Sequence, residues 1–168
     1  AISSFMRLVA VPLYQGEPLY QSYLIVSAAD KQTRSLADLR RRNFAFSDPD
    51  SNSGHLYTEY LLSLRNETPA SFFGRTFYTW SHRKVVEAVA AGLADGGAVD
   101  GYVWETLALF HPELTAQTRV VEKSRKFGHP PIIAGPSASF SQISELQRVL
   151  FGMSRDQAGA DLLHTLNL

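Results

Sequence analysis

Residues 43–55 read NFAFSDPDSNSGH, and they join a predicted strand directly to a predicted helix. Residues 43–46, apolar except for Asn43, favour a short strand, which the turn signal Asp48-Pro49-Asp50 ends. Ser, Asn and Gly residues then precede a helix predicted from about Ser53 to Leu64, on which Leu56, Tyr60 and Leu64 share an apolar face. A strand that leads straight into a helix is the building unit of an α/β fold.

The same alternation continues on both sides of this segment. Further strands are predicted over residues 5–11, 22–26, 76–80, 98–99, 118–122 and 131–134. A capping box at Ser35 predicts a short helix. Ser81 is the predicted cap of a helix from His82 to about Leu93, which Gly96-Gly97 would end, and two more helices close the chain. This order predicts an α/β fold with a mostly parallel sheet flanked by helices.

Composition excludes several classes of function. The chain has 168 residues, 16 basic and 16 acidic side chains and a formal net charge of zero. A partner bound through a broad basic field, such as a nucleic acid, is therefore not expected. The sequence has no cysteine, which excludes disulfides, cysteine-based zinc sites and thiol nucleophiles. No apolar run reaches the roughly 18 residues that cross a bilayer.

Ser51, Asn52, Ser53 and Gly54 lie at the first predicted strand-to-helix junction. In α/β sheets ligands bind beyond the carboxyl ends of the strands, where the helices begin. A helix start leaves backbone N–H groups unpaired and its dipole favours negative charge, so these hydroxyls and N–H groups could hold an oxyanion. The alternative is that Ser51 or Ser53 only caps the helix.

His82 lies at a second junction of the same kind, after the strand predicted over 76–80. Its imidazole could donate a hydrogen bond to an anion, more strongly when protonated. The alternative is a surface histidine in the first helical turn. A tetrahedral anion has enough acceptor atoms to engage both junctions.

Signatures of catalysis and of metal binding are absent from the sequence. There is no Gly-x-Ser-x-Gly elbow, phosphate loop or dinucleotide fingerprint, and the five histidines lack metal-ligand spacing. A triad of Ser53, His82 and Asp48 is conceivable in space, but nothing in the sequence argues for it. We therefore expect neither catalysis nor a metal or other cofactor.

A series of motifs resembles the phosphonate/phosphite-type periplasmic substrate-binding proteins of bacterial ABC transporters. The motifs include YQSYLIV (20–26), SLADLR (35–40), FAFSDPDSNSG (44–54) and FGHPPII (127–133), with residues 81–82, 88–89, 92, 95–96 and 98–100 matching between them in the same order. The resemblance implies the type 2 periplasmic-binding-protein fold, in which two lobes enclose a ligand cleft.

The resemblance also implies a division of the chain into lobes. Residues 25–118 would form the complete second lobe, and residues 1–24 and 119–168 would be the remainder of the first. The opening part of the first lobe has no counterpart here, so we expect a fragment or a truncated sensor domain. Its exposed first-lobe surface could then support a homodimer.

Ligand-binding residues follow from the same resemblance. Residues 51–54 match the segment that grips the phosphonate oxygens, and His82 matches the histidine at the next helix start. Tyr20 would line the cleft at the hinge, although an aromatic beside a strand more often belongs to the core or to a sheet edge than to a ligand site. Asp100 matches an acidic position near the cleft, although capping of the next helix is the simpler interpretation. Tyr102 and Pro130 stand where relatives that bind aminoethylphosphonate carry acidic groups, so an amine-bearing ligand is not expected.

The resulting hypothesis is a solute-binding component that holds a small phosphonate-, phosphite- or phosphate-like oxyanion without chemistry. Hinge closure would report occupancy to an ABC transporter permease or a membrane sensor, which implies a periplasmic or other extracytoplasmic location. Two alternatives remain open at this point: the effector domain of a cytoplasmic transcription regulator, and a hydrolase that uses His82.

Overall fold

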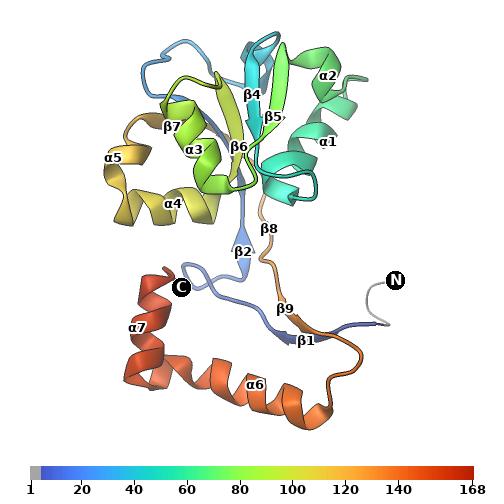
Figure 1. The fold of residues 1–168 in the computed structure, drawn as a ribbon, viewed down its shortest axis with the longest axis vertical. Coiled ribbons are helices and arrows are strands. Elements are labelled where there is room, and N and C mark those ends of the chain that lie inside the picture. The colour runs from blue at the N-terminus through green and yellow to red at the C-terminus, as the bar shows by residue number, and fades with distance from the viewer. Residues whose placement is uncertain (1–4) are drawn as a thin grey trace. The chain divides into compact units, whose positions relative to one another are not determined.

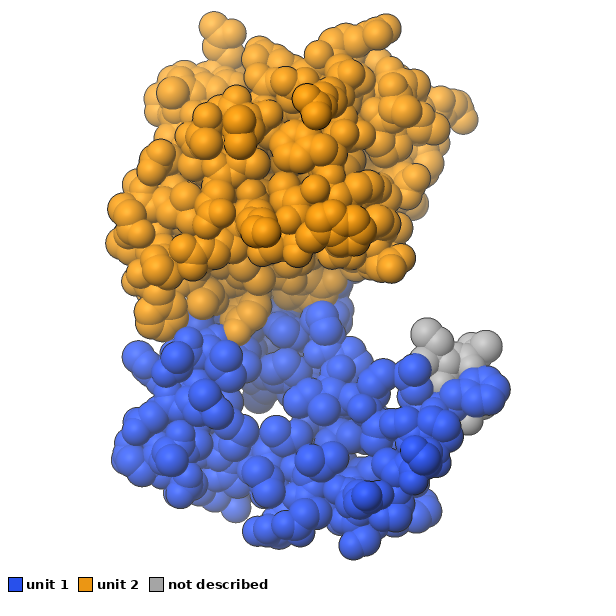
Figure 2. All heavy atoms as spheres, viewed as in Figure 1, with its two compact units in different colours: residues 1–19, 127–168 blue, residues 20–126 orange. Residues whose placement is uncertain are grey.

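The computed structural model describes residues 5–168, which divide into two compact units. Of the described residues, one unit comprises 5–19 and 127–168, and the other comprises 20–126 (Figure 2). The sequence placed the divisions at 24/25 and 118/119 instead. The structure has its divisions at 19/20 and 126/127, because the strands over residues 22–27 and 118–123 pair with each other and both belong to the larger unit. Residues 1–4 of the predicted first-lobe segment lie outside the described residues.

The larger unit contains a five-stranded sheet in the order β5-β4-β6-β3-β7 (Figure 1). Its strands are β3 Ser22–Ser27, β4 Asn43–Phe46, β5 Arg75–Tyr78, β6 Gly96–Asp100 and β7 Thr118–Lys123. Strand β4 is parallel to β5 and β6, whereas β3 is antiparallel to both β6 and β7. All strands except β3 therefore run in the same direction, which confirms the predicted mostly parallel sheet.

Three helices cover one face of this sheet: α3 His82–Ala90, α4 Gly101–Phe110 and α5 Pro112–Thr115. On α3, Val85, Val86 and Val89 are fully buried, as their spacing predicts. The fourth buried residue of the helix is Ala88 rather than the predicted Ala90. The prediction that Gly96-Gly97 only breaks the helix was wrong, because both residues belong to β6. A Cβ on Gly97 would lie 2.5 Å from Val85 Cγ1, so glycine permits the close approach of α3.

The opposite face is covered by the 3₁₀ helix η2 Leu36–Leu39, by α1 Tyr57–Ser63 and by α2 Pro69–Phe72. Its core is rich in phenylalanine, and the rings of Phe44 and Phe73 stack with centroids 4.3 Å apart. The apolar face predicted for α1 is not the buried one. Leu62 packs into the core, whereas Leu56, Tyr60 and Leu64 are exposed.

The predicted helix starts differ in detail from those observed. Ser35 forms the predicted capping box of η2 with Asp38. The helix predicted from Ser53 begins instead with a π-helical segment, η3 Asn52–Leu56, that continues into α1. Ser81 occupies the N-cap position of α3, but its side chain makes no capping hydrogen bond.

The smaller unit is built on an antiparallel pair of strands, β1 Arg7–Ala10 and β9 Ile132–Ala134. The closing helices α6 Phe140–Gly152 and α7 Gln157–Thr165 are joined by the 3₁₀ helix η4 Met153–Arg155. A short pair, β2 Leu19–Tyr20 and β8 Phe127–Gly128, lies where the chain passes from one unit to the other.

The buried core of the smaller unit is formed by Val9, Ala134 and Ile143. Many of its large apolar side chains are exposed, among them Phe5, Leu8, Leu13, Ile133, Phe140, Val149 and Phe151. Among residues 5–168, no helix combines the length and the apolar character needed to span a membrane.

Candidate functional site

The first junction contains a helix N-terminus that has a capping residue but keeps two backbone N–H groups unpaired among the described residues. Ser51 is the N-cap, and its Oγ accepts a hydrogen bond from Gly54 N at 3.0 Å. The capping alternative is therefore confirmed for Ser51. The backbone N–H groups of Asn52 and Ser53, by contrast, have no acceptor within the part of the chain that the structure describes. These two donors, with the hydroxyl proton of Ser51, are the groups that an anion would use, whereas the Ser53 hydroxyl donates to Asp100 Oδ2.

Tyr20 closes the other side of this junction. The side chain is almost fully buried, and its Oη accepts a hydrogen bond from Asn52 Nδ2 at 2.8 Å. Burial raises the pKa of Tyr20, and the negative charge of Asp100 raises it further, although hydrogen bonds from Asn52 and Ser53 act in the opposite direction. The phenol therefore stays protonated near neutral pH.

Gly54 brings the two junctions into contact. A Cβ at this position would lie 1.9 Å from Ser47 Oγ and 3.0 Å from His82 Cε1. Only a residue without a side chain allows η3 to approach the end of β4 and the start of α3 this closely. The Gly54 carbonyl also accepts a hydrogen bond from Ser47 N at 3.2 Å, which fixes the approach. The sequence predicted both junctions separately, and the structure places them side by side.

His82 is held in one tautomer by the end of the neighbouring strand. Its Nδ1 lies 3.1 Å from the backbone N of Asp100, so Nδ1 accepts and Nε2 carries the ring proton. Burial lowers the pKa of His82, although the carboxylates of Asp100 and Asp48 act in the opposite direction. The ring is therefore neutral near pH 7. The donor that faces a ligand would therefore be the Nε2–H of a neutral imidazole, without the added strength of a protonated ring.

Asp100 caps helix α4, as the simpler interpretation of the sequence held. Its Oδ1 accepts a hydrogen bond from Tyr102 N at 2.9 Å, while its Oδ2 lies 3.5 Å from Ser53 Oγ. The carboxylate therefore links α4 to the first junction. Burial raises the pKa of Tyr102, with a further contribution from Asp100, and a hydrogen bond to Thr106 opposes the increase. Tyr102 thus lies at the α4 start, beside Asp100.

Two serines that the sequence analysis did not single out also position the site. Ser22 Oγ donates to the carbonyl oxygen of Ser53 at 2.6 Å, and Ser22 N donates to Ser124 Oγ at 2.8 Å. These bonds tie the η3 start to strands β3 and β7. Ser47 is a third such residue, and its place directly after strand β4 is the signal that could have identified it.

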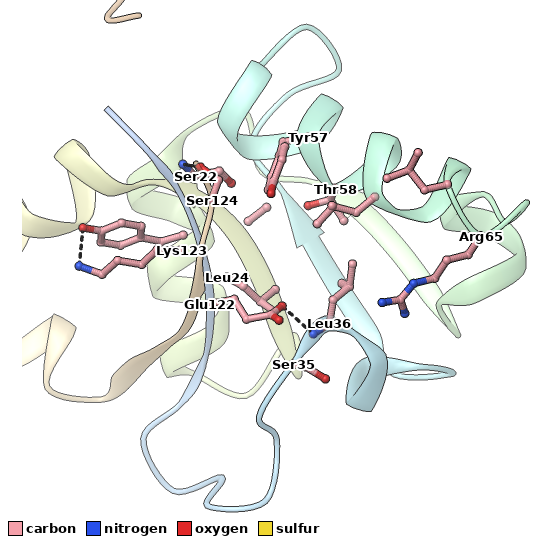
Figure 3. Close-up of a pocket in the computed structure, with 14 residues that line it drawn as sticks. Ser22, Leu24, Ser35, Leu36, Tyr57, Thr58, Arg65, Glu122, Lys123 and Ser124 are labelled. Atoms are coloured by element: carbon pink, nitrogen blue, oxygen red, sulfur yellow. Dashed lines mark hydrogen bonds between the residues drawn. The ribbon is translucent and has the colours of Figure 1, made fainter. Parts of the chain in front are cut away.

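A pocket of about 370 Å³ lies elsewhere in the larger unit, between the β3–β7 edge and helix α1 (Figure 3). Its apolar wall includes Leu24, Leu36 and Leu61, and Arg65 and Glu122 also line it. It shares Ser22 with the surroundings of the junctions, but none of Ser51, Asn52, Ser53, Gly54, His82 or Asp100 lines it. The oxyanion donors therefore belong to a different surface from this pocket.

The donor set is suited to binding an oxyanion rather than to attacking a carbonyl. A serine-type triad requires His82 Nδ1 to donate to a carboxylate and Nε2 to accept from a hydroxyl. Here Nδ1 accepts from a backbone N–H, so the polarity is reversed. Within residues 5–168, no group of three or more His, Asp or Glu side chains is placed to hold a metal ion.

Comparison with protein families shows to which family the chain belongs. A family model described as the periplasmic substrate-binding protein of phosphonate ABC transporters matches residues 4–168. The chain belongs to this family. The predicted resemblance and fold class are thereby confirmed. No curated protein matches the chain significantly.

Solved structures give the same fold. The binding protein component of a phosphonate ABC transporter from Pseudomonas aeruginosa shares 28% identity at a TM-score of 0.81, covering 97% of this chain and 54% of that protein. PhnD1 from Prochlorococcus marinus, solved with methylphosphonate, shares 19% identity at a TM-score of 0.82, covering 96% and 63%. A Xanthomonas citri protein solved with ATP shares 20% identity at a TM-score of 0.71, covering 98% and 63%. The chain thus spans about half to two thirds of these structures.

Proposed function

We propose that the chain forms the anion-holding part of an ABC transporter solute-binding protein, with a small phosphonate-, phosphite- or phosphate-like oxyanion as ligand. The backbone N–H groups of Asn52 and Ser53, the hydroxyl of Ser51, and Nε2–H of His82 would bind its oxygens, and Ser53 would be oriented by its hydrogen bond to Asp100. Membership of the phosphonate-binding family supports this ligand class. The methylphosphonate in the Prochlorococcus protein supports it for a relative with the same fold.

One observation carries the proposal: the two junctions approach so closely that a Cβ on Gly54 would lie 3.0 Å from His82 Cε1. Two helix starts that meet can present donors to the same anion, and their dipoles add at that point. The proposed role requires binding alone. Free energy from these contacts would favour a closed arrangement of the protein, which a transporter can distinguish from the empty one.

Isothermal titration calorimetry with methylphosphonate, phosphite, phosphate and sulfate tests the proposal. We expect saturable binding of at least one phosphorus oxyanion and weaker binding of sulfate. A His82→Asn variant is the matched control, because an asparagine oxygen can replace Nδ1 as the acceptor for Asp100 N while the distal donor is lost. If no phosphorus oxyanion binds the wild-type protein, or if the variant binds as tightly as wild type, the proposed site is wrong.

The partner and the location are parts of the same proposal. A permease or a membrane sensor in an extracytoplasmic compartment would read the occupied state, as expected for this family. The exposed apolar side chains of the smaller unit, such as Phe5, Leu8 and Phe140, would also support self-association as a homodimer. Light scattering coupled to size-exclusion chromatography tests the second point, and a monomer at tens of micromolar would contradict it.

A further inference from the structure

Trp80 adopts a backbone conformation that is unfavourable for its side chain. Its φ angle is +61°, in the left-handed region that bulky residues rarely occupy. The side chain is also 72% exposed, so burial of the indole does not offset the strain. Strained backbone that packing does not explain is concentrated at binding sites and switches. The position therefore calls for a role outside the protein core.

The indole lies beside a second aromatic ring that is anchored to the π-helical segment. The ring centroids of Tyr78 and Trp80 are 6.0 Å apart. Tyr78 Oη and His55 Nε2 form a hydrogen bond of 3.1 Å, and the Tyr78 ring also lies near Phe46. Tyr78 is thus fixed on two sides, and it provides a rigid support next to the exposed indole.

This aromatic pair adjoins the proposed anion site. Trp80 N donates to the carbonyl oxygen of Ser47 at 2.6 Å, and Ser47 is the residue packed against Gly54. Trp80 precedes His82 by two residues, so their Cα atoms lie within about 7 Å of each other. The left-handed turn at Trp80 therefore lies within two residues of the α3 start and is hydrogen-bonded to Ser47, which packs against Gly54.

Charge around the pair restricts what it could contact. The carboxylates of Glu59 and Asp48 lie close enough to Tyr78 to add to the effect of burial, which raises the pKa of its phenol. The face of an aromatic ring is itself electron-rich. A second negative group on the ligand would be repelled here, whereas an uncharged planar group could stack on the indole.

We propose that Trp80, supported by Tyr78, is a specificity-determining residue that stacks against an uncharged planar substituent of the bound phosphonate, such as an aryl group. This inference rests on the proposed function, because the anion site must hold the phosphonate oxygens. It goes further by naming the organic part of the ligand. The favoured ligands would be arylphosphonates rather than phosphite or methylphosphonate.

Calorimetric titration with phenylphosphonate and methylphosphonate measures this preference. We expect the wild-type protein to bind phenylphosphonate about 2- to 13-fold more tightly, the range expected for one aromatic contact. Trp80→Ala should remove the preference and leave the methylphosphonate affinity within about twofold. A Trp80→Ala variant that keeps the full preference, or a wild-type protein that has none, would overturn the inference.

The second tryptophan provides a matched control. Trp104 lies on α4, where its Nε1 donates to Thr118 Oγ1 at 3.1 Å. Trp104→Phe should keep the preference for phenylphosphonate. The chain has two tryptophans, so this variant also leaves Trp80 as its sole indole fluorophore. Phenylphosphonate should change its emission strongly and methylphosphonate weakly, whereas equal responses would contradict stacking.

Trp80→Gly separates a binding role from a structural one. Glycine adopts a positive φ without strain, so this variant should melt no lower than wild type and still lose the preference for phenylphosphonate. A large fall in melting temperature would show that the indole serves the fold, and would overturn the inference. If methylphosphonate binds and phenylphosphonate has no advantage, only this inference fails. If neither compound binds, the proposed function fails with it.

Discussion

The imidazole of His82 accepts a hydrogen bond at Nδ1 from the backbone N–H of Asp100, over 3.1 Å. This bond joins the start of α3 to the end of β6, two consecutive elements whose joined ends lie 18 residues apart in the sequence. It determines which ring nitrogen carries the proton, and therefore which atom can meet a ligand. The electrostatics of the site follow from it, because a neutral ring adds a directed donor without adding a charge.

Replacing His82 by Asn should separate binding from folding. The asparagine oxygen can accept from Asp100 N, whereas the distal donor is absent. We expect phosphonate affinity to fall about 10- to 100-fold, the loss of one hydrogen bond to a charged ligand. His82→Ala should weaken binding too, but should also lower stability by about 1–3 kcal/mol because Asp100 N loses its buried acceptor. Calorimetry and urea unfolding distinguish these outcomes, and equal stability of the two variants would contradict this account.

Acidification should destabilise the protein through His82. Burial holds its pKa in the folded protein below the ordinary value of 6.5. Below pH 6.5 the unfolded chain therefore takes up a proton more readily than the folded one, and stability falls as the pH drops towards the folded pKa. The difference in urea midpoint between wild type and His82→Asn should change over this window and be constant above pH 7.5. A pH-independent difference would show that His82 titrates normally.

Local signals in the sequence were sufficient for most elements of the larger unit. The strand 43–46 and the Ser35 capping box are observed as predicted, because turn residues and caps act over a few positions. Gly96-Gly97 misled the analysis, since glycine usually breaks an element. Here glycine is required because α3 packs directly on the sheet: a Cβ on Gly97 would clash with the side chain of Val85. A requirement set by a neighbouring element is not visible in local sequence.

The site shows the same division between local and long-range information. Ser51 and Gly54 could be identified from the chemistry of a helix start. The contact of Gly54 with Ser47 and His82 could not, because it depends on how η3 and α3 pack around the end of β4. The neutral state of His82 also escaped prediction. Its cause is burial of the imidazole, which lowers its pKa, and the tautomer is set by a backbone N–H that lies 18 positions further along the chain.

Asp30 should contribute to stability until the solution becomes strongly acidic. Its carboxylate accepts from Thr33 Oγ1 at 2.6 Å and from the backbone of Thr33 and Gln32. These bonds, led by that from the Thr33 hydroxyl and helped by Arg119, lower its pKa from 3.8 to about 2. The contribution is complete above pH 4 and is lost as the pH falls through about 2. Wild type should therefore exceed Asp30→Asn in stability at pH 5, and the two should converge near pH 2; a constant gap would contradict the assignment.

Gly54→Ala should disrupt the contact between the two junctions. The new Cβ would lie 1.9 Å from Ser47 Oγ and 2.7 Å from Ser47 Cβ, so backbone must shift. We expect a loss of about 1–3 kcal/mol in urea unfolding, typical of overpacking, together with weaker phosphonate binding. The double variant with Ser47→Gly removes both clashing atoms and should recover most of the stability. Gly152→Ala is the control, because a Cβ there meets nothing within 4 Å. If the single and double variants are equally unstable, the clash with Ser47 is not the cause, and the role assigned to Gly54 in joining η3 to α3 is wrong.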